Sequence, residues 1–467
     1  MSDYDVVVIG AGLAGCSAAL EASEAGASVL LVESEAVVGG STRLAHGLIM
    51  GAATRFQREQ GIEDTADALY AHYQTLNTWS VQPSLARRLA QDAGPSIEWL
   101  ADLGVPFVGV YPSGDEPQPR GHAAAGGQSI IDPLYAQIRR RTGIDVALRQ
   151  RVDRMLVENG EVVGIAAGDD IVRAKRVVMA CGGFGADKGM LATWYPACLE
   201  AAGSWLWFMG GPGSRGDGIR LGSQVDAQIV GRNRGQMGAM RPDFGRYTDT
   251  YFPGWLLIVN EQGRRFFNEM APYSVQDPLL RAQVGPVFAV FDHAAKEAAV
   301  PHSTAAQKKV ALPGEEEEDW ISPKIDAMVE AGKVERAGSL ADLAFRIGVP
   351  PANLAATVER YNGFAEAGVD ADFEKPFHPL APVATSPFYA TELRLYTLAL
   401  TSCGPRIDDD GRVLDQTGRA IPGLFAAGEC TGGVLGDVYA GSGNALANAL
   451  VFGRVAGRVA GREALKS

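Results

Sequence analysis

The residues best suited to bind a cofactor begin close to the start of the chain. The motif Gly10-x-Gly12-x-x-Gly15 follows an apolar run, and Glu33 stands about 20 residues further on. We expect Gly10 to form a tight turn, Gly12 to let the backbone approach a pyrophosphate, and Gly15 to let a helix pack on the preceding strand. The positive end of that helix would face the phosphates, and Glu33 can accept hydrogen bonds from both ribose hydroxyls. In this strand–turn–helix–strand context the motif predicts a dinucleotide site.

A second glycine-rich region lies near the other end. Gly428-Glu429 follows an apolar strand, and Gly443-Asn444 opens the last helix. A carboxylate at position 429 can hold ribityl hydroxyls, and the amides at the helix start can stabilise negative charge on a reduced flavin ring. A flavin needs such a second segment, whereas a bare nicotinamide site does not. The two regions together predict bound FAD and predict that both chain ends meet in one domain.

The candidate cofactor-binding residues share a position in glycine turns, at strand ends or at helix starts. They are Gly10, Gly12, Ala14, Gly15, Glu33, Ser34, Gly40, Ser41, Thr42, Ala45, Gly47, Val152, Ala180, Gly182, Asp217, Gly428, Glu429, Ser442, Asn444, Ala445 and Leu446.

The elements that must position these residues follow from hydrophobic periodicity. Residues 4–34 predict strand, turn, helix and strand, residues 65–76 and 84–102 predict helices, and residues 145–183 predict a series of short strands. A glycine- and proline-rich stretch, 111–127, predicts a long loop. We therefore predict an α/β fold. Its Rossmann-like FAD-binding domain comprises residues 1–233 and 401–467, and residues 234–400 form an inserted α+β cap domain for substrate.

Composition excludes several classes of function. The 467 residues are 46% hydrophobic and 21% charged, with a net charge of −13, which argues against nucleic acid or an anionic membrane as partner. No run of ~18 apolar residues predicts a membrane span, and the chain enters a strand directly, without a signal peptide. Five cysteines and six histidines show neither a disulfide framework nor metal-ligand spacing. We expect a cytoplasmic protein without a metal site.

Several motifs together are similar to the fumarate reductase/3-ketosteroid dehydrogenase flavoprotein family over nearly the whole chain. The matching segments are residues 10–15, 39–42, 180–184, 216–219, 260–269 and 428–457. The resemblance implies a flavin domain built from both chain ends and an inserted domain that caps the flavin. Members that attach FAD covalently carry a histidine at about the place of Ser41, so the resemblance implies non-covalent FAD.

The branch of the family is indicated by three departures from the dicarboxylate reductases. Their proton-donating arginine is replaced by Tyr273, and their His-His-Thr-x-Gly-Gly by residues 399–404, Ala-Leu-Thr-Ser-Cys-Gly. Their Asn-Arg-Leu-Gly-Gly-Asn is replaced by residues 439–444, Tyr-Ala-Gly-Ser-Gly-Asn. The chain instead resembles the 3-ketosteroid dehydrogenases, in which a Pro-Tyr pair supplies the base and Tyr-x-Gly-x-Gly binds the ketone.

The chemistry implied is the formation of a C=C bond beside a ketone. Tyr273 would take the α-proton, while the Tyr439 hydroxyl and the Gly443 amide would bind the carbonyl oxygen. The β-hydride would pass to the flavin. Tyr111 could assist as a second tyrosine. Weaker substrate candidates are Arg120, His122 and Ser442, with Arg394 as a further partner for a substrate carboxylate. For Arg120, a solvated position or one beside the cofactor phosphates is at least an equal alternative.

We therefore expect an FAD-dependent dehydrogenase of a cyclic ketone, such as a 3-ketosteroid or 4-oxocyclohexanecarboxylate. Its partners would be that small molecule and an external electron acceptor, which could be a quinone, oxygen or a protein. The alternatives are an enoate or dicarboxylate reductase and a flavin electron-transfer partner without a small substrate.

Overall fold

The computed structural model describes residues 2–112, 117–240, 252–300, 320–375 and 380–466, and the chain divides into two units. Unit 1 comprises Met1–Leu199, Phe208–Gln236 and Leu398–Ser467, and unit 2 comprises Glu200–Trp207 and Met237–Thr397. The expected boundaries, before 234 and after 400, lie close to these divisions. The assignment of residues 200–207 to unit 2 had no counterpart in the sequence pattern.

Unit 1 is built on an eight-stranded sheet whose path runs β18-β19-β9-β1-β2-β6, with β8 pairing β9 and β7 pairing β8. The strands are β1 (Tyr4–Ile9), β2 (Val29–Val32), β6 (Ile144–Ala147), β7 (Arg154–Glu158), β8 (Glu161–Ala167), β9 (Asp170–Met179), β18 (Arg412–Leu414) and β19 (Ala420–Ala426). The five strands from β19 to β6 are parallel. Because β1 and β19 both pair with β9, segments from the two ends of the chain share one sheet, and the predicted α/β class is confirmed.

Helices and smaller sheets complete unit 1. The helices are α1 (Leu13–Glu24), α2 (Arg55–Glu59), α3 (Ala66–Leu76), α4 (Pro83–Asp102), α5 (Gln128–Arg140), α6 (Lys188–Trp194), α8 (Asp217–Ser223) and α15 (Asn444–Ala464), and α7 (Pro196–Ala202) crosses into unit 2. A three-stranded sheet contains β3 (Leu48–Met50), β5 (Gly121–Ala124) and β4 (Phe107–Tyr111), and β11 (Ile229–Val230) pairs with β17 (Gly404–Pro405). The strand β5 lies inside the stretch predicted as a loop, because its small residues carry no hydrophobic alternation.

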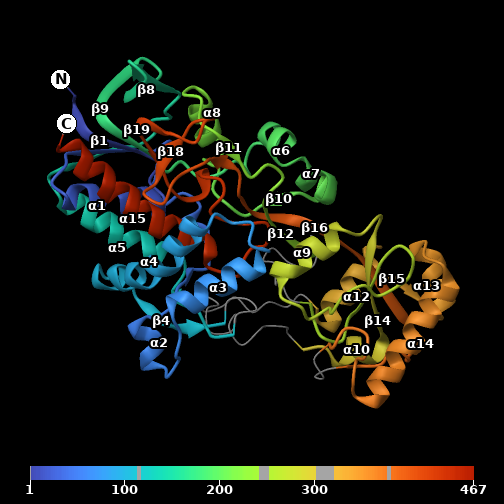
Figure 1. The fold of residues 1–467 in the computed structure, drawn as a ribbon. Coiled ribbons are helices and arrows are strands. Elements are labelled where there is room, and N and C mark those ends of the chain that lie inside the picture. Colours follow the sequence, from blue (N-terminus) through green and yellow to red (C-terminus); the bar gives the residue numbers. More distant parts are fainter. Residues whose placement is uncertain (1, 113–116, 241–251, 301–319, 376–379, 467) are drawn as a thin grey trace. The chain divides into compact units, whose positions relative to one another are not determined.

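The packing of α15 on α1 joins the two chain ends, which lie together in Figure 1. Gly453 and Gly457 of α15 face Ala14 and Ala18 of α1. A Cβ added at Gly453 would lie 2.4 Å from the Ala14 carbonyl oxygen, and one added at Gly457 would lie 2.2 Å from that of Ala18. Only glycine permits so close an approach of the two backbones. Apolar residues of β1, β2, β9, β19 and these helices form the core beneath.

Unit 2 contains most of a six-stranded sheet around the long strand β16 (Phe388–Thr401), with the path β10-β16-β14-β13 and with β12 and β15 also pairing β16. Its other strands are β10 (Trp207–Phe208), β12 (Gly235–Met240), β13 (Leu257–Val259), β14 (Val287–Asp292) and β15 (Glu335–Ala337). The helices are α9 (Tyr273–Arg281), α10 (His293–Ala298), α12 (Ser322–Glu330), α13 (Leu340–Ile347) and α14 (Pro351–Ala367). A separate apolar core lies between this sheet and α13 and α14. Within the described ranges of the chain, no helix has the length and hydropathy needed to cross a membrane.

Candidate cofactor and active site

The turn between β1 and α1 contains three glycines, and the packing around each of them differs. Gly10 has φ +99°, a left-handed conformation that favours glycine. A Cβ on Gly15 would lie 1.7 Å from the Gly10 carbonyl oxygen, so the helix could not pack on the turn. A Cβ on Gly12 would have its nearest neighbours, Gly39 O and Thr42 Oγ1, at 3.9 Å. Packing within the protein therefore requires Gly10 and Gly15, whereas a Cβ at Gly12 would make only ordinary van der Waals contacts, so packing does not require glycine there.

The N-terminus of α1 and the carboxylate of Glu33 lie at this same turn. Gly12 caps α1 without a side chain, and the first turn of the helix contains no acidic residue. The Leu13 amide donates to the Thr42 hydroxyl at 3.2 Å. Glu33, which is 6% exposed, accepts a hydrogen bond from the Ala11 amide at 2.8 Å. The turn thus offers a helix end that carries partial positive charge and, beside it, a carboxylate with spare acceptor capacity.

The predicted segment 39–42 packs against the same turn. The Gly39 amide donates to the Ala11 carbonyl at 2.8 Å, and a Cβ on Gly40 would lie 3.7 Å from the Gly12 Cα. The Ser41 hydroxyl lies 3.2 Å from that of Ser214 and accepts from the Gly211 amide at 2.9 Å. The structure therefore brings Gly40, Ser41 and Thr42 to the glycine turn.

The ends of β9 and β19 hold a second carboxylate. Glu429, in the 3-10 turn Gly428–Cys430, accepts from the Thr401 amide at 3.0 Å and from its hydroxyl at 3.2 Å. A Cβ on Gly183 would lie 2.2 Å from Glu429 Oε1. Removal from water raises the pKa of the Glu429 carboxyl above its ordinary value. The carboxyl is thus fixed at the ends of two neighbouring parallel strands.

Some predicted cofactor residues are engaged within the protein. Asp217 begins α8 and forms an ion pair with Arg151, whose Nη2 lies 2.8 Å from Asp217 Oδ1. Val152 is 4% exposed in the core of unit 1. The Ala45 carbonyl accepts from the Gly127 amide at 2.7 Å, and Gly47 has φ +86°.

The start of α15 carries the predicted ketone-binding tyrosine. Gly443 has φ +95°, and its carbonyl accepts from the Met50 amide at 3.1 Å. The Ala445 amide, which we expected to face the flavin, donates to the Tyr439 hydroxyl at 3.1 Å. Removal from water raises the pKa of Tyr439 above its ordinary value. Its hydroxyl therefore keeps its proton at neutral pH and lies at the positive end of a 21-residue helix.

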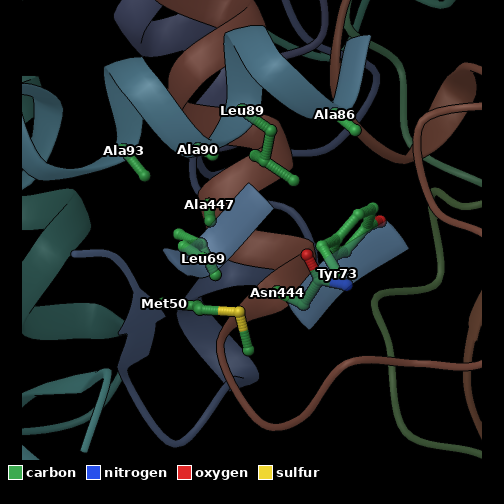
Figure 2. A pocket seen from close by; sticks show the side chains of 9 residues that line it. All are labelled: Met50, Leu69, Tyr73, Ala86, Leu89, Ala90, Ala93, Asn444 and Ala447. Carbon is green, nitrogen blue, oxygen red and sulfur yellow. The ribbon is translucent and has the colours of Figure 1, made fainter. Parts of the chain in front are cut away.

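Asn444, the first residue of α15, lines a small cavity between α3, α4, α15 and β3 (Figure 2). The cavity has a volume of about 10 Å³ and is otherwise lined mainly by apolar side chains. The buried Asn444 amide lies close enough to Tyr73 to lower the pKa of that hydroxyl, but neither of its polar atoms has a hydrogen bond of normal geometry. Burial outweighs this effect and raises the pKa of Tyr73 to about 12.

The structure gives Arg120 and His122 roles inside unit 1. Arg120 forms a bidentate ion pair with Asp64 at 2.7 and 2.8 Å, and both side chains are 0% exposed. His122 is buried between the Thr54 hydroxyl, at 2.7 Å, and the Arg120 carbonyl, at 3.0 Å. Burial lowers the pKa of His122 to about 4. The charge of Arg120 is thus paired with that of Asp64 away from solvent, and its binding to a substrate carboxylate stays a prediction.

Tyr111 ends strand β4 within the three-stranded sheet. Its hydroxyl folds back along its own strand and lies 3.5 Å from the Val108 carbonyl, and a Cβ on Gly109 would lie 2.7 Å from it.

In unit 2, Tyr273 is the first residue of α9, and its side chain lies outside the described part of the structure. The preceding segment is fixed by a buried charge network. Arg265 Nη2 lies 2.8 Å from both Glu269 Oε2 and Asp370 Oδ2, and Lys375 Nζ lies 3.4 Å from Glu269 Oε2. Arg394, the other candidate for a substrate carboxylate, stacks on Trp205 and pairs with Glu392 at 2.6 Å.

The comparisons with known proteins identify the family. A family described as "FAD binding domain" matches residues 5–446. The chain belongs to this FAD-binding family.

The NADH:fumarate oxidoreductase of Klebsiella pneumoniae (strain 342) is 32% identical over 95% of the chain, which spans only 46% of that protein. The 4-oxocyclohexanecarboxylate 2-dehydrogenase of Sinomonas cyclohexanicum is 27% identical over 95% of the chain and 90% of its own length. The 3-ketosteroid Δ4-(5α)-dehydrogenase of Rhodococcus jostii RHA1, solved with 4-androstene-3,17-dione, has a TM-score of 0.79 and 26% identity, covering 99% of this chain and 98% of that one.

This flavoprotein has residues that fit FAD in unit 1. Gly12, which packing within the protein does not require to be glycine, and the start of α1, whose N-cap has no side chain, suit a diphosphate, and Glu33 suits the adenosine ribose. Glu429 suits the ribityl hydroxyls. The isoalloxazine ring, when bound, supplies a two-electron acceptor.

Sequence reasoning overlooked two polar residues of α3 and its end, Tyr73 and Asn77. Both are 1% exposed, and both bind the backbone of residues 434–438, which lead to Tyr439. Tyr73 lies in the helix predicted over residues 65–76, and nothing in the sequence pattern sets it apart within that helix. For Asn77 the sequence offers only an asparagine just after a predicted helix, and its burial becomes known from the structure.

Proposed function

We propose that this FAD-dependent flavoprotein is a dehydrogenase that introduces a C=C bond α,β to the carbonyl of a cyclic ketone, with FAD bound non-covalently. A 3-ketosteroid and 4-oxocyclohexanecarboxylate are the candidate substrates. The observation that carries the proposal is the hydrogen bond from the Ala445 amide to the Tyr439 hydroxyl at 3.1 Å.

The hydroxyl of Tyr439 has the properties needed to polarise a ketone. A hydroxyl that accepts a hydrogen bond at the positive end of a helix becomes a stronger donor. Burial outweighs the opposite effect of this hydrogen bond and raises the pKa of Tyr439, so the hydroxyl keeps its proton. It can therefore donate a hydrogen bond to a ketone oxygen and stabilise the enolate charge that develops when the α-proton leaves. The Gly443 amide would be the second donor.

Tyr273 is the proposed base for the α-proton. Its position at the start of α9 places a tyrosine where the first turn of a helix favours negative charge, which supports a phenolate there. The buried network of Arg265, Glu269, Asp370 and Lys375 would hold the segment before it.

A second candidate, a reductase of an enoate or dicarboxylate, is supported by the similarity to the Klebsiella NADH:fumarate oxidoreductase. A dicarboxylate needs cationic partners, and residues 439–444 include none. The arginine that we first offered for a carboxylate, Arg120, is neutralised by Asp64. The ketone chemistry itself requires no cation, and 4-oxocyclohexanecarboxylate needs a cationic partner for only one carboxylate instead of two, so the ketone reaction is preferred.

Anaerobic flavin spectroscopy separates the two candidates. Oxidised holoprotein is mixed with 4-oxocyclohexanecarboxylate or with 4-androstene-3,17-dione, and the flavin band at ~450 nm is followed. Bleaching by a ketone is the expected result, and Tyr439→Phe should slow it. If fumarate reoxidises the reduced protein while neither ketone bleaches it, the reductase replaces our proposal. If neither the ketones nor fumarate changes the flavin spectrum, the result supports the third reading, a flavin electron-transfer protein without a small substrate.

A further inference from the structure

The segment that carries Tyr439 is held by side chains from distant parts of unit 1. We refer to residues 434–439 as the Tyr439 segment. The Tyr73 hydroxyl of α3 donates to the Val434 carbonyl at 2.8 Å. Arg234, close to the start of β12, forms an ion pair with Asp437, with Nη2 3.2 Å from Oδ2. These contacts fix the segment at two of its residues.

Asn77 makes the most restrictive of these contacts. It follows the last residue of α3 and is 1% exposed. Its Oδ1 accepts from the Val438 amide at 2.9 Å, while its Nδ2 donates to the Tyr73 carbonyl at 3.1 Å. The planar carboxamide therefore bridges the end of α3 and the residue immediately before Tyr439.

The fit between Asn77 and the segment leaves no spare space. A Cβ added at Gly436 would lie 1.9 Å from Asn77 Oδ1 and 2.8 Å from Val81 Cγ2. The backbone of the segment thus lies directly against the Asn77 amide. On the other side of Tyr439, the hydroxyl is held by the Ala445 amide at the start of α15.

We propose that Asn77, assisted by Tyr73, is a positioning residue that sets the Tyr439 hydroxyl at the N-terminus of α15. This inference rests on the proposed function in so far as Tyr439 binds the substrate carbonyl. Asn77 touches the segment and not the hydroxyl, so it acts through Tyr439. Loss of its amide frees the Val438 N–H, and the segment then no longer fixes the direction of the Tyr439 ring.

A double-mutant cycle tests the proposal in the holoenzyme, with 4-oxocyclohexanecarboxylate and 4-androstene-3,17-dione as probes. Asn77→Leu should lower kcat by about 10- to 100-fold, because a displacement of about 1 Å has an effect of that order. In the Tyr439→Phe background the same change should lower kcat less than about 3-fold, because the hydroxyl that it positions is absent. Asn77→Asp, which keeps the acceptor for the Val438 amide, should recover most of the rate.

The matched control is Gln74→Leu. Gln74 is also a buried amide on α3, but it donates to the Val81 carbonyl at 3.1 Å. A loss of kcat equal to that of Asn77→Leu would show a general effect on α3 and would overturn the proposal. Equal losses from Asn77→Leu with and without the Tyr439 hydroxyl would overturn it as well. If Asn77→Leu does not fold, Tyr73→Phe takes its place in the double-mutant cycle with Tyr439→Phe. This change removes only the hydroxyl that binds Val434.

A crystal structure of the Asn77→Leu holoenzyme makes the test independent of turnover. We expect a shifted Tyr439 segment and loss of the hydrogen bond between Tyr439 and Ala445. An unchanged bond would refute the positioning role. If neither ketone reduces the flavin, or if Tyr439→Phe turns over at the wild-type rate, the proposed function fails, and the crystal structure still decides the role of Asn77.

Discussion

Replacing Arg120 by methionine tests whether this arginine is structural. In the native protein Arg120 Nε and Nη2 bind the two oxygens of Asp64 at 2.7 and 2.8 Å, with both side chains 0% exposed. Gln57 Nε2 gives Asp64 one further hydrogen bond, at 3.2 Å. Arg120→Met keeps much of the side-chain volume but leaves the Asp64 carboxylate buried without its cation.

The magnitude follows from the complete burial of the pair. Removing one partner of a buried ion pair costs about 3–5 kcal/mol, because the remaining charge cannot be solvated. For a folding unit of this size, each kcal/mol lowers the melting temperature by about 2 °C, so we expect a fall of roughly 6–10 °C. Replacing both charges, with Arg120→Met and Asp64→Leu, should recover much of this loss.

The assay is thermal unfolding of the holoprotein at fixed protein and FAD concentrations, together with the KM for 4-oxocyclohexanecarboxylate. Arg55→Met is a matched control. The Arg55–Asp102 pair has a similar distance, 2.9 Å, but its side chains are 39% and 65% exposed, so its loss should leave the melting temperature almost unchanged. An unchanged melting temperature for Arg120→Met, together with a raised KM for the carboxylated ketone, would refute the structural role and would show that Arg120 binds the substrate carboxylate.

Three further sets of measurements follow from the site. Tyr439→Phe should lower kcat by about 10²–10³, as expected for the loss of one oxyanion donor. Tyr273→Phe should lower kcat by roughly 10²–10⁴, as expected for the loss of a general base. Both variants should keep their FAD content, and a wild-type kcat in either would exclude the role of that tyrosine. Acid precipitation should release the yellow flavin into the supernatant, because Ser41 offers no covalent attachment, and colour in the pellet would contradict this. Burial lowers the pKa of His122 from 6.5 to about 4, so the folded protein holds this side chain neutral. The unfolded chain therefore binds the proton first as the pH falls. The free energy of unfolding is highest above pH 6.5 and falls by about 3 kcal/mol as the pH drops towards 4. Melting temperatures between pH 7 and pH 4.5 should fall less steeply for His122→Leu than for the native protein, and parallel curves would contradict the assignment.

The parts of the fold that the sequence predicted well depend on local pattern. The strand, glycine turn and helix at residues 4–24 follow from a buried apolar run, a residue that needs positive φ, and helical spacing, all within a few residues. The meeting of both chain ends in one domain could be predicted because both flavin motifs must contact one cofactor, whereas the parallel pairing of β1 and β19 with β9 came from the structure. The strand β5 was missed because glycine, alanine and histidine give it no alternation.

The roles that sequence reasoning missed depend on contacts between distant residues. Arg120 and Asp64 are 56 positions apart, and an arginine in a polar stretch gives no sign that it will be buried. Asn77 and Val438 are 361 positions apart. Their contact exists only because the end of α3 and the segment before α15 lie together in unit 1, which a local pattern does not specify.

Asn77 and Tyr73 illustrate why the surroundings of a site are harder to predict than its reactive residues. Tyr439 stands in a glycine motif whose types and spacing already indicate chemistry. The residues around it serve only to hold backbone groups, and the hydroxyl and amide that do so have no distinctive spacing. Their constraint comes from burial, because an unpaired backbone N–H or C=O away from water is costly. Once the fold is known, the same rule identifies them, since the buried Tyr73 hydroxyl and Asn77 amide have the backbone of residues 434 and 438 as partners.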